Sequence, residues 1–190
     1  MQDISLHLLD IIENSVRAKA RNIWIIITIL EPENLLRIII KDDGFGMDNE
    51  TLQAAQDPFY TSKTERLKKV GLGIPLFKEN AERCAGSFKI ESVVSKGTVL
   101  TAEFAYDHID RMPLGMISDT ILTAVLGHEQ IDLHLKLQHC KIDGSCLDFK
   151  FSTELVKKEL GDIPLSYPDV ITFLDEMLKE GIKNTEMEEN

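Results

Sequence analysis

The apolar residues at the start of the chain follow two different periods. Between Ile4 and about Ala20 they recur at helical intervals, which predicts a helix with one apolar side. The next two segments, NIWIIITIL and LLRIII, are β-branched runs separated by the turn-forming residues 31–34. They predict an antiparallel β-hairpin.

The segment that follows this hairpin alternates between polar loops and short regular elements. Residues 49–56 are expected to form a short helix, and residues 57–70 are polar and predict a mobile loop. A second long helix is expected from the glycine-rich residues 71–74 to about Cys84, where Gly86 ends it. Two strands, SFKIESVV and TVLTAEFAY, then complete the first half of the chain.

The pattern changes beyond Asp110. Residues 113–127 predict a helix, and the following IDLHLKL and CLDFKF alternate strictly between apolar and polar positions, so they predict a second hairpin. Because side chains alternate between the two faces of a strand, Leu137 shares a face with Phe149 and Phe151 only if the connection is odd. We therefore expect a three-residue connection rather than a two-residue one.

The last part of the chain predicts two more helices. One spans residues 153–160 and is stopped by Gly161, and the other begins at Pro168, a residue suited to the first helical position. This second helix is expected to end near Gly181. The tail at residues 183–190 is expected to be disordered.

The net charge of −11 is distributed unevenly. Residues 1–108 carry 13 basic and 16 acidic side chains, whereas residues 109–190 carry 8 and 16. The chain is longer than one compact domain usually requires, so we expect a domain at 1–108 and a small acidic α+β module at 109–190. Acidic surfaces repel nucleic acids and anionic lipids, so we expect a protein partner for this module, and neither nucleic acid nor membrane.

Composition also bears on the compartment. No segment approaches the roughly 20 apolar residues of a membrane span, and the chain does not open with a signal peptide, so a cytoplasmic protein is expected. The three cysteines, Cys84, Cys140 and Cys146, are odd in number and fit no disulfide framework. We expect all three to be free thiols, as in a reducing compartment.

Candidate chemistry begins in the first predicted helix. Asp10, Glu13 and Asn14 are spaced by three and four residues, so they share one face and can point into a common cleft. The side-chain oxygen of Asn14 is a suitable Mg²⁺ ligand when nucleotide phosphates supply the remaining charge. By themselves, polar residues at helical spacing are more often a solvated face.

Two glycine-bearing motifs follow along the chain. Asp42 ends a strand and precedes Gly44 and Gly46; its carboxylate can accept the exocyclic amine of adenine, and the glycines let the backbone approach the base. Gly71 and Gly73 enter a helix and can offer backbone N–H groups to phosphates. Such a glycine pair alone is a weak signal, because many are only turn formers.

The order of the motifs is more specific than any one of them. Asp-Ile-Ile-Glu-Asn-Ser is followed by Asp-Asp-Gly-Phe-Gly-Met, Pro-Phe-Tyr-Thr-Ser-Lys, Gly-Leu-Gly-Ile and Lys-Gly-Thr. Over about residues 3–106 this order resembles the GHKL superfamily of gyrases, Hsp90 chaperones, MutL mismatch-repair proteins and histidine kinases. The resemblance implies the Bergerat fold, a two-layer α/β sandwich with helices on a mixed sheet, and it implies ATP and Mg²⁺ as cofactors.

The resemblance also assigns roles to residues. Asn14 would be the Mg²⁺ ligand of the N box, Asp42 the adenine-binding residue, and Thr98 would close the adenine pocket. The glycine boxes would be Gly44 with Gly46 and Gly71 with Gly73. The other nucleotide-binding candidates from these motifs are Met47, Thr61, Ser62, Lys63, Leu72 and Ile74.

Within the superfamily, the sequence from Asp57 to Lys63 and the Gly-Leu-Gly-Ile motif look like a histidine-kinase catalytic domain. The N box begins within the first turns of the chain, so we expect no phosphoacceptor histidine domain. Hydrolysing members carry a glutamate four residues before the N-box asparagine, and here that position is Asp10. Candidate catalytic residues are therefore Asp10 or Glu13 as base, and Lys63 at the terminal phosphate.

These observations favour an ATP-binding regulatory protein that phosphorylates a protein partner in trans or switches its grip on that partner. A slow Mg²⁺-dependent ATPase of the MutL or gyrase kind and a non-catalytic ATP sensor are the alternatives, and the oligomeric state, including a homodimer, stays open. A zinc site is a weaker hypothesis, because the spacing of its candidate ligands fits no compact signature. Those candidates are His128, His134, His139, Cys140 and Cys146.

Overall fold

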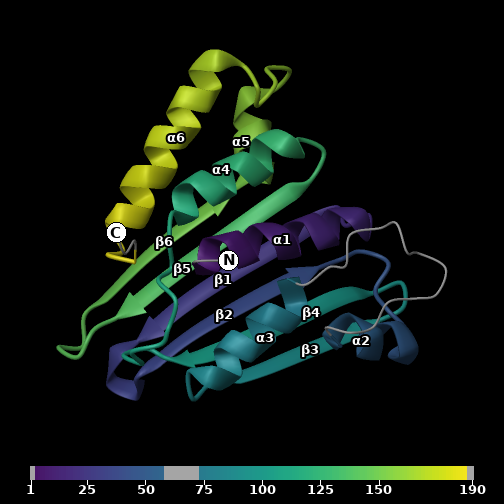
Figure 1. Cartoon of the computed structure of the whole chain (residues 1–190). Helices are drawn as coiled ribbons and strands as arrows, with labels where there is room; N and C mark the ends of the chain where they lie inside the picture. The colour runs from purple at the N-terminus through teal and green to yellow at the C-terminus, as the bar shows by residue number, and fades with distance from the viewer. Residues whose placement is uncertain (1–2, 58–72, 188–190) are drawn as a thin grey trace.

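One six-stranded sheet organises the molecule. The computed structural model describes residues 3–57 and 73–187, and its strands lie in the order β3-β4-β2-β1-β5-β6 (Figure 1). All neighbouring pairs are antiparallel except β1 and β5, which are parallel. The strands are β1 Asn22–Leu30, β2 Leu35–Asp42, β3 Ser87–Val93, β4 Gly97–Ala105, β5 Asp132–Cys140 and β6 Cys146–Ser152.

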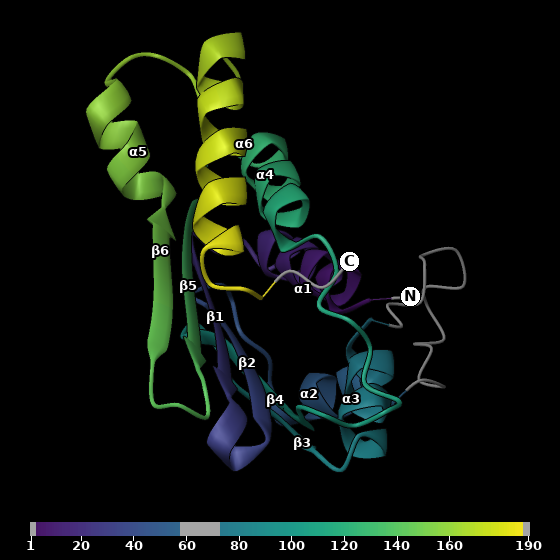
Figure 2. The ribbon, with the colours of Figure 1, turned by 90° about the vertical axis from the view of Figure 1, so that its left-hand side faces the viewer.

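Apart from α5, the helices form a second layer on one face of this sheet, as the fold class predicted (Figure 2). Helix α1 packs against α3 on one side and α4 on the other, and α4 packs against α6. Figure 2 shows α5 at the end of β6, away from α1 and α3. The helices are α1 Ile4–Arg17, α2 Asn49–Gln56, α3 Gly73–Arg83, α4 Ile117–Gly127, α5 Thr153–Leu160 and α6 Pro168–Lys183, with a short 3₁₀ turn at Glu31–Glu33.

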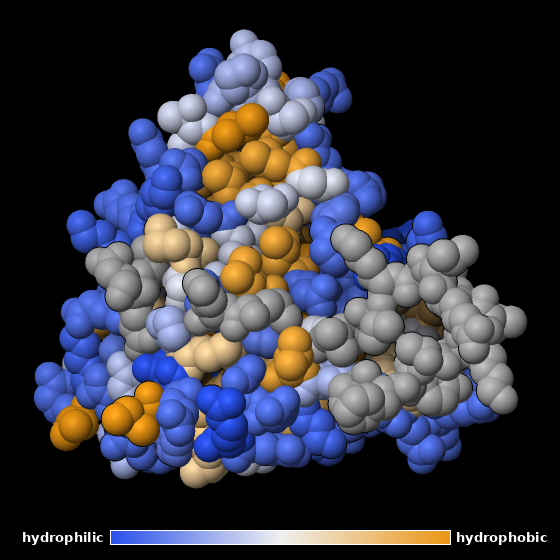
Figure 3. Space-filling view, in the orientation of Figure 1, coloured by the Kyte–Doolittle hydropathy of each residue, from blue (hydrophilic) through white to orange (hydrophobic). Residues whose placement is uncertain are grey.

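Strict alternation along the central strands gives the sheet one covered and one open face. In β1, Ile23, Ile25 and Ile27 are fully buried against the helices, while the residues between them are only half-buried. The predicted first hairpin is confirmed, with Ile26 opposite Ile39. Figure 3 views the helical side and shows a largely hydrophilic surface with apolar areas over α4 and α6.

Residues beyond 108 continue the sheet of the first half. In the segment 109–190, for which we expected a small acidic α+β module, β5 pairs along the whole of β1, from Asn22 opposite Asp132 to Leu30 opposite Cys140. The reason is that β1 would otherwise be an unpaired edge, and the parallel crossover through α4 supplies its partner. The chain is therefore a single layered body in this structure.

The second hairpin has the predicted facing and a slightly longer connection. Leu137 lies opposite Phe149, and residues 141–145 join the two strands. Inside this connection the Lys141 N–H donates to the Ser145 carbonyl at 2.8 Å, which leaves three residues between them. The prediction of an odd number of connecting residues is confirmed. The number is odd because β6 must place its apolar side chains on the covered face of the sheet, which determines the register.

One expectation about the hairpin is wrong. Cys140 and Cys146 face each other at its end, with Cα atoms 4.1 Å apart, and are joined by a disulfide, so only Cys84 is a free thiol in the described chain. The same register that places Leu137 opposite Phe149 brings these two cysteines together.

The start of one helix also differs from expectation. Helix α4 begins at Ile117 rather than at Pro113, because the carbonyls of Pro113 and Leu114 accept hydrogen bonds from the first N–H groups of α1. Pro113 and Leu114 therefore cap the start of α1 rather than begin a helix of their own.

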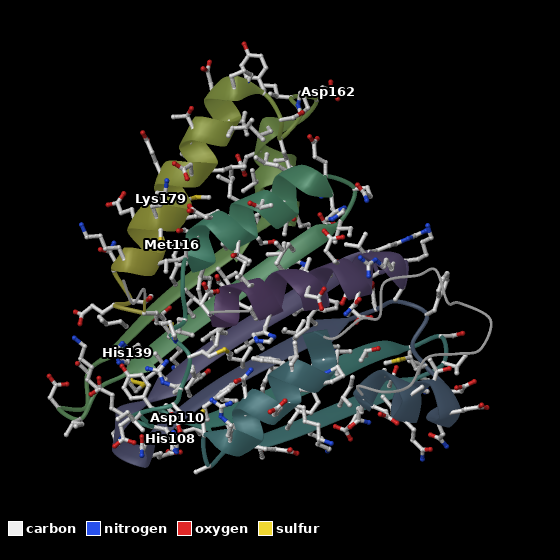
Figure 4. All side chains as sticks on the ribbon, viewed as in Figure 1. His108, Asp110, Met116, His139, Asp162 and Lys179 are labelled. Carbon is white, nitrogen blue, oxygen red and sulfur yellow. A yellow bond between two sulfur atoms is a disulfide. The ribbon has the colours of Figure 1, made fainter. Side chains whose placement is uncertain are left out.

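The end of the chain is packed as far as the structure describes it. Met187 is fully buried. The carbonyl of Thr185 lies 2.9 Å from the ring Nδ1 of His139, a residue that Figure 4 labels. The other ring nitrogen of His139 lies 3.0 Å from a carboxylate oxygen of Glu31. The expectation of disorder therefore fails for 183–187, and residues 188–190 lie outside the described chain.

Candidate functional site

The candidate site lies where three strands end beside helix α1. Asp42, the last residue of β2, is directly opposite Thr98 on β4, and Thr98 is opposite Ser92 on β3. Sequence reasoning nominated Asp42 and Thr98 from separate motifs, and the register brings them side by side. The strand ends thus form one wall of a site whose other wall is α1.

The Asp42 carboxylate is held in place from two directions. It is only 6% exposed. The hydroxyl of Ser15 on α1 donates to one of its oxygens at 3.0 Å, and the N–H of Gly44 donates to the other at 2.9 Å. An ionised carboxylate has about four acceptor sites, so this one can still accept a hydrogen bond from a ligand amine.

Close backbone contacts explain the glycines around this carboxylate. Gly97 has φ +94°, and a side chain there would overlap the carbonyl of Asp42. Gly46 has φ +63°, and a side chain there would overlap the carbonyl of Val93. Both positions demand glycine for conformation and for space. The turn after β2 is therefore pressed against the turn between β3 and β4.

A hydroxyl pair joins the same two turns. The hydroxyls of Ser92 and Thr98 lie 2.9 Å apart, and the N–H of Met47 donates to Ser92 at 2.8 Å. Met47 and Thr98 were candidates from the sequence, whereas Ser92 and Ser15 were not singled out. Ser15 could have been found from its place directly after Asn14 in the first motif. Ser92 lies on a strand that carries no motif, so no signal in the sequence pointed to it.

Asp43 anchors the loop that enters β1. Its carboxylate accepts hydrogen bonds from the N–H groups of Arg21 at 2.7 Å and Asn22 at 2.9 Å, and from the Asn22 side chain at 2.8 Å. Burial raises the pKa of the Asp43 carboxyl, but these hydrogen bonds outweigh it and leave the pKa below its usual 3.8. The pair Asp42-Asp43 thus divides its work, with Asp42 facing the site and Asp43 holding the loop.

The other part of the site lies between α1 and the start of α3. A side chain at Gly73, the first described residue of α3, would overlap the Asp10 carboxylate, so these groups are in contact. One turn further along α1, Asn14 is half-buried and its side-chain oxygen lies 3.4 Å from a guanidinium nitrogen of Arg17. Asp10 and Asn14 therefore lie on one face of α1. Ser15, next to Asn14, contacts Asp42 at the strand ends.

One turn before Asp10, His7 closes the base of this region. It is fully buried, and its ring stacks on Phe77 of α3 at a centroid distance of 5.0 Å. Burial lowers the pKa of His7 below its usual 6.5, so the ring is neutral at pH 7. This contact fixes the approach of α3 to α1.

Glu13 does not join Asp10 and Asn14. One of its carboxylate oxygens lies 2.6 Å from the ring Nε2 of His128, the residue that follows α4. The helical spacing that seemed to place three polar groups in one cleft instead splits them, because α1 has α3 on one flank and α4 on the other.

Several predicted site residues cannot be placed. Thr61, Ser62, Lys63, Gly71 and Leu72 lie outside the described residues, as does most of the predicted loop. Ile74 is half-buried against the core.

The candidate zinc ligands are scattered and otherwise engaged. Cys140 and Cys146 form the disulfide, His134 lies 3.0 Å from the Ser152 hydroxyl, and His128 and His139 contact separate glutamates. Within residues 3–57 and 73–187, no three histidine, cysteine or acidic side chains are grouped to hold a metal ion. Over the same residues, none of the helices combines the length and the apolar character that crossing a membrane requires.

Comparison with known proteins adds independent information. Residues 2–108 match the family described as histidine kinase-, DNA gyrase B-, and HSP90-like ATPase. The sensor histidine kinase WalK of Bacillus subtilis (strain 168) is 31% identical over 111 residues, which cover 55% of this chain and 18% of that protein. Sporulation kinase C of the same organism is 33% identical over 91 residues, covering 48% and 21%.

The chain thus spans about a fifth of the length of these two kinases. Among solved structures, the N-terminal domain of a DNA repair protein is similar with a TM-score of 0.50 and 14% identity, covering 80% of this chain and 53% of that one. At this identity the likeness concerns the fold alone, and it extends beyond residue 108.

Proposed function

Because this chain belongs to the family of histidine kinase-, DNA gyrase B-, and HSP90-like ATPases, we propose that it binds ATP with Mg²⁺ and uses the nucleotide to regulate a protein partner in trans. The observation that carries the proposal is the Asp42 carboxylate, oriented by Ser15 and Gly44 at the ends of three strands. A fixed carboxylate beside close-packed glycine turns suits recognition of an adenine amine.

The donor set around this carboxylate fits an adenine nucleotide. Asp42 accepts the exocyclic amine, and the Thr98 hydroxyl, already paired with Ser92, lies beside it on the neighbouring strand. The amide oxygen of Asn14 is the ligand for Mg²⁺, which offsets phosphate charge when bound. Backbone N–H groups at the start of α3, near Gly73, receive the phosphates.

With the nucleotide bound, catalysis by this chain consists of positioning and charge stabilisation. Asn14 and the start of α3 hold the phosphate end, while the strand ends hold the base. Lys63 is proposed to contact the terminal phosphate. The partner supplies the acceptor group in a kinase reaction, or responds to closure of the nucleotide site in a switch.

A slow ATPase is the second candidate, favoured by the position of Asp10. Its carboxylate contacts Gly73, at the helix proposed to receive the phosphates, and this contact supports Asp10 as the base that activates a water. Glu13 is engaged by His128 and is not the base in this proposal.

Labelled ATP distinguishes these reactions. The purified chain is incubated with γ-labelled ATP and Mg²⁺, and free phosphate and protein-bound label are followed together, with Asn14→Ala and Asp10→Asn as variants. Free phosphate that is lost in both variants indicates an ATPase. Nucleotide binding without either product indicates a kinase or switch that requires its partner, and absence of nucleotide binding refutes the proposal.

A further inference from the structure

A groove lies on the open face of the sheet, on the side away from α1 and the nucleotide site. Its floor is formed by β1, β5 and β6 and its wall by the start of α5, where Leu155 is 63% exposed. The groove has a volume of about 450 Å³. The side chains that matter for its chemistry are Trp24, Ile26, His134, Lys136, Lys150 and Leu155.

Trp24 is held rigidly in the floor. The ring of His134 stacks on it at a centroid distance of 5.5 Å, and the ammonium group of Lys41 lies over it at 5.1 Å. These contacts come from β5 and β2, the strands on either side of β1. A ring held between two neighbours presents a fixed apolar edge and costs little conformational entropy on binding.

Two lysines in the groove are placed against each other. Lys136 and Lys150 are exposed and directly opposite on β5 and β6. Closely and widely spaced residue pairs alternate along an antiparallel pair of strands. The Cα atoms of Cys140 and Cys146 are 4.1 Å apart, and the lysine pair lies an even number of residues from them, so it is also a closely spaced pair. Like charges in this arrangement destabilise a sheet.

No ion pair within the described residues neutralises either lysine, although Asp148 lies on the same face of β6, two residues from Lys150. The chain as a whole nevertheless has a net charge of −11. Glu154 is the acidic residue in the groove wall, and it does not pair with them either. A local unfavourable charge pair beside a rigid apolar surface is typical of a binding site.

We propose that this groove binds an acidic segment of a protein partner, with a carboxylate between Lys136 and Lys150 and a large aliphatic side chain against Trp24, Ile26 and Leu155. The inference rests on the proposed function only in that the chain acts on a protein partner. In this proposal the partner binds the basic groove, and not the acidic C-terminal surface that the sequence suggested.

Other occupants fit less well. A second copy related by two-fold symmetry would bring the same lysines face to face. Nucleic acid bases would stack on an open aromatic face, and both faces of Trp24 are already covered.

Trp24 is the single tryptophan of the chain, so its fluorescence reports occupancy of the groove. The full chain, without nucleotide, is titrated with the blocked peptide DELLDEL, with NQLLNQL and DESSDES as neutral and non-apolar controls. The same titration is made with the double variant Lys136→Glu/Lys150→Glu. Thermal unfolding of this variant is compared with that of wild type, so that any loss of binding is assigned to the groove only in a folded protein. Lys78→Glu/Lys183→Glu changes the net charge equally on α3 and α6 and is the matched control.

We expect saturable binding of DELLDEL, at least about tenfold weaker binding to the groove variant, and unchanged binding to the control variant. Equal binding of NQLLNQL, no effect of the groove variant, or equal competition by a poly-dT oligonucleotide would overturn the inference. So would a dimer in sedimentation that the groove variant dissociates. ATP binding by the wild type is measured separately. If the wild type binds the peptide but not ATP, the result counts against the proposed function alone.

Discussion

The contact between Glu13 and His128 predicts that the second half of the chain stabilises the helix that carries Asn14. The two side chains are 2.6 Å apart and retain 36% and 21% exposure, so the contact is neither fully solvated nor buried. A charge-assisted hydrogen bond in such a setting contributes about 1 kcal/mol, between the values for exposed and buried pairs. In a chain of this size, this corresponds to a shift of about 2–4 °C in Tm.

A double-mutant cycle measures this coupling. Urea unfolding at pH 7 is followed for the wild type, Glu13→Ala, His128→Ala and the double variant, and the interaction energy is expected to be about 1 kcal/mol. Glu13→Gln should in addition leave any phosphate release within about twofold of wild type, whereas Asp10→Asn should lower it by at least about 100-fold. A coupling energy near zero, or phosphate release that depends on Glu13 rather than Asp10, would refute this account of α1.

Three further predictions concern stability. The extra unfolding free energy of wild type over Asp43→Asn should be full at pH 7, because the folded pKa is lowered, and should vanish as pH falls below 3.8 through that folded pKa; a gap that grows in acid would contradict it. Gly97→Ala should lower both Tm and nucleotide affinity, because its side chain meets a β2 carbonyl, whereas Gly144→Ala, also at positive φ but in open space, should cost only about 1 kcal/mol and spare affinity. Thiol titration in denaturant should find one thiol without reductant and three with it, and reduction of Cys140–Cys146 should cost about 2 kcal/mol; three thiols without reductant would exclude the disulfide.

Most of the fold could be predicted from the pattern of apolar and polar residues in the sequence. The β-branched alternation of β1 and β2 predicted both strands and their pairing, and the facing of Leu137 and Phe149 predicted the parity of the second hairpin. These features are local, because side-chain periodicity alone determines which face is buried. The parallel pairing of β5 with β1 was missed, since it depends on a crossover through α4 rather than on any local signal.

For the candidate site, too, the sequence indicated the residues in local motifs but not their long-range contacts. Asp42 and its glycines were nominated because they stand in an order of motifs that resembles the GHKL superfamily. The partner of Asp42, Ser15, is 27 residues away, and the partner of Glu13, His128, is 115 residues away. Contacts at such distances are set by how helices pack on the sheet, and helical spacing alone could not tell that Glu13 faces α4 while Asp10 faces α3.

The disulfide was within reach of the sequence. Once Leu137 is placed opposite Phe149, counting outward along both strands places Cys140 opposite Cys146. Counting cysteines and noting an odd total concealed a pair that the predicted hairpin already brought together.

Recognition of adenine by Asp42 is the central claim, and nucleotide binding by Asp42→Asn tests it most directly. The substitution keeps the size of the side chain and one oxygen, to which the Gly44 N–H can still donate. The other oxygen becomes an NH₂ group, which can donate to the Ser15 hydroxyl but cannot accept the adenine amine. Calorimetric titration with ATP and GTP, beside a thermal unfolding control, should show ATP preferred by wild type and ATP binding weakened at least about 100-fold in the variant, with the fold intact. Unchanged ATP affinity in a folded Asp42→Asn protein would contradict the assignment of the site.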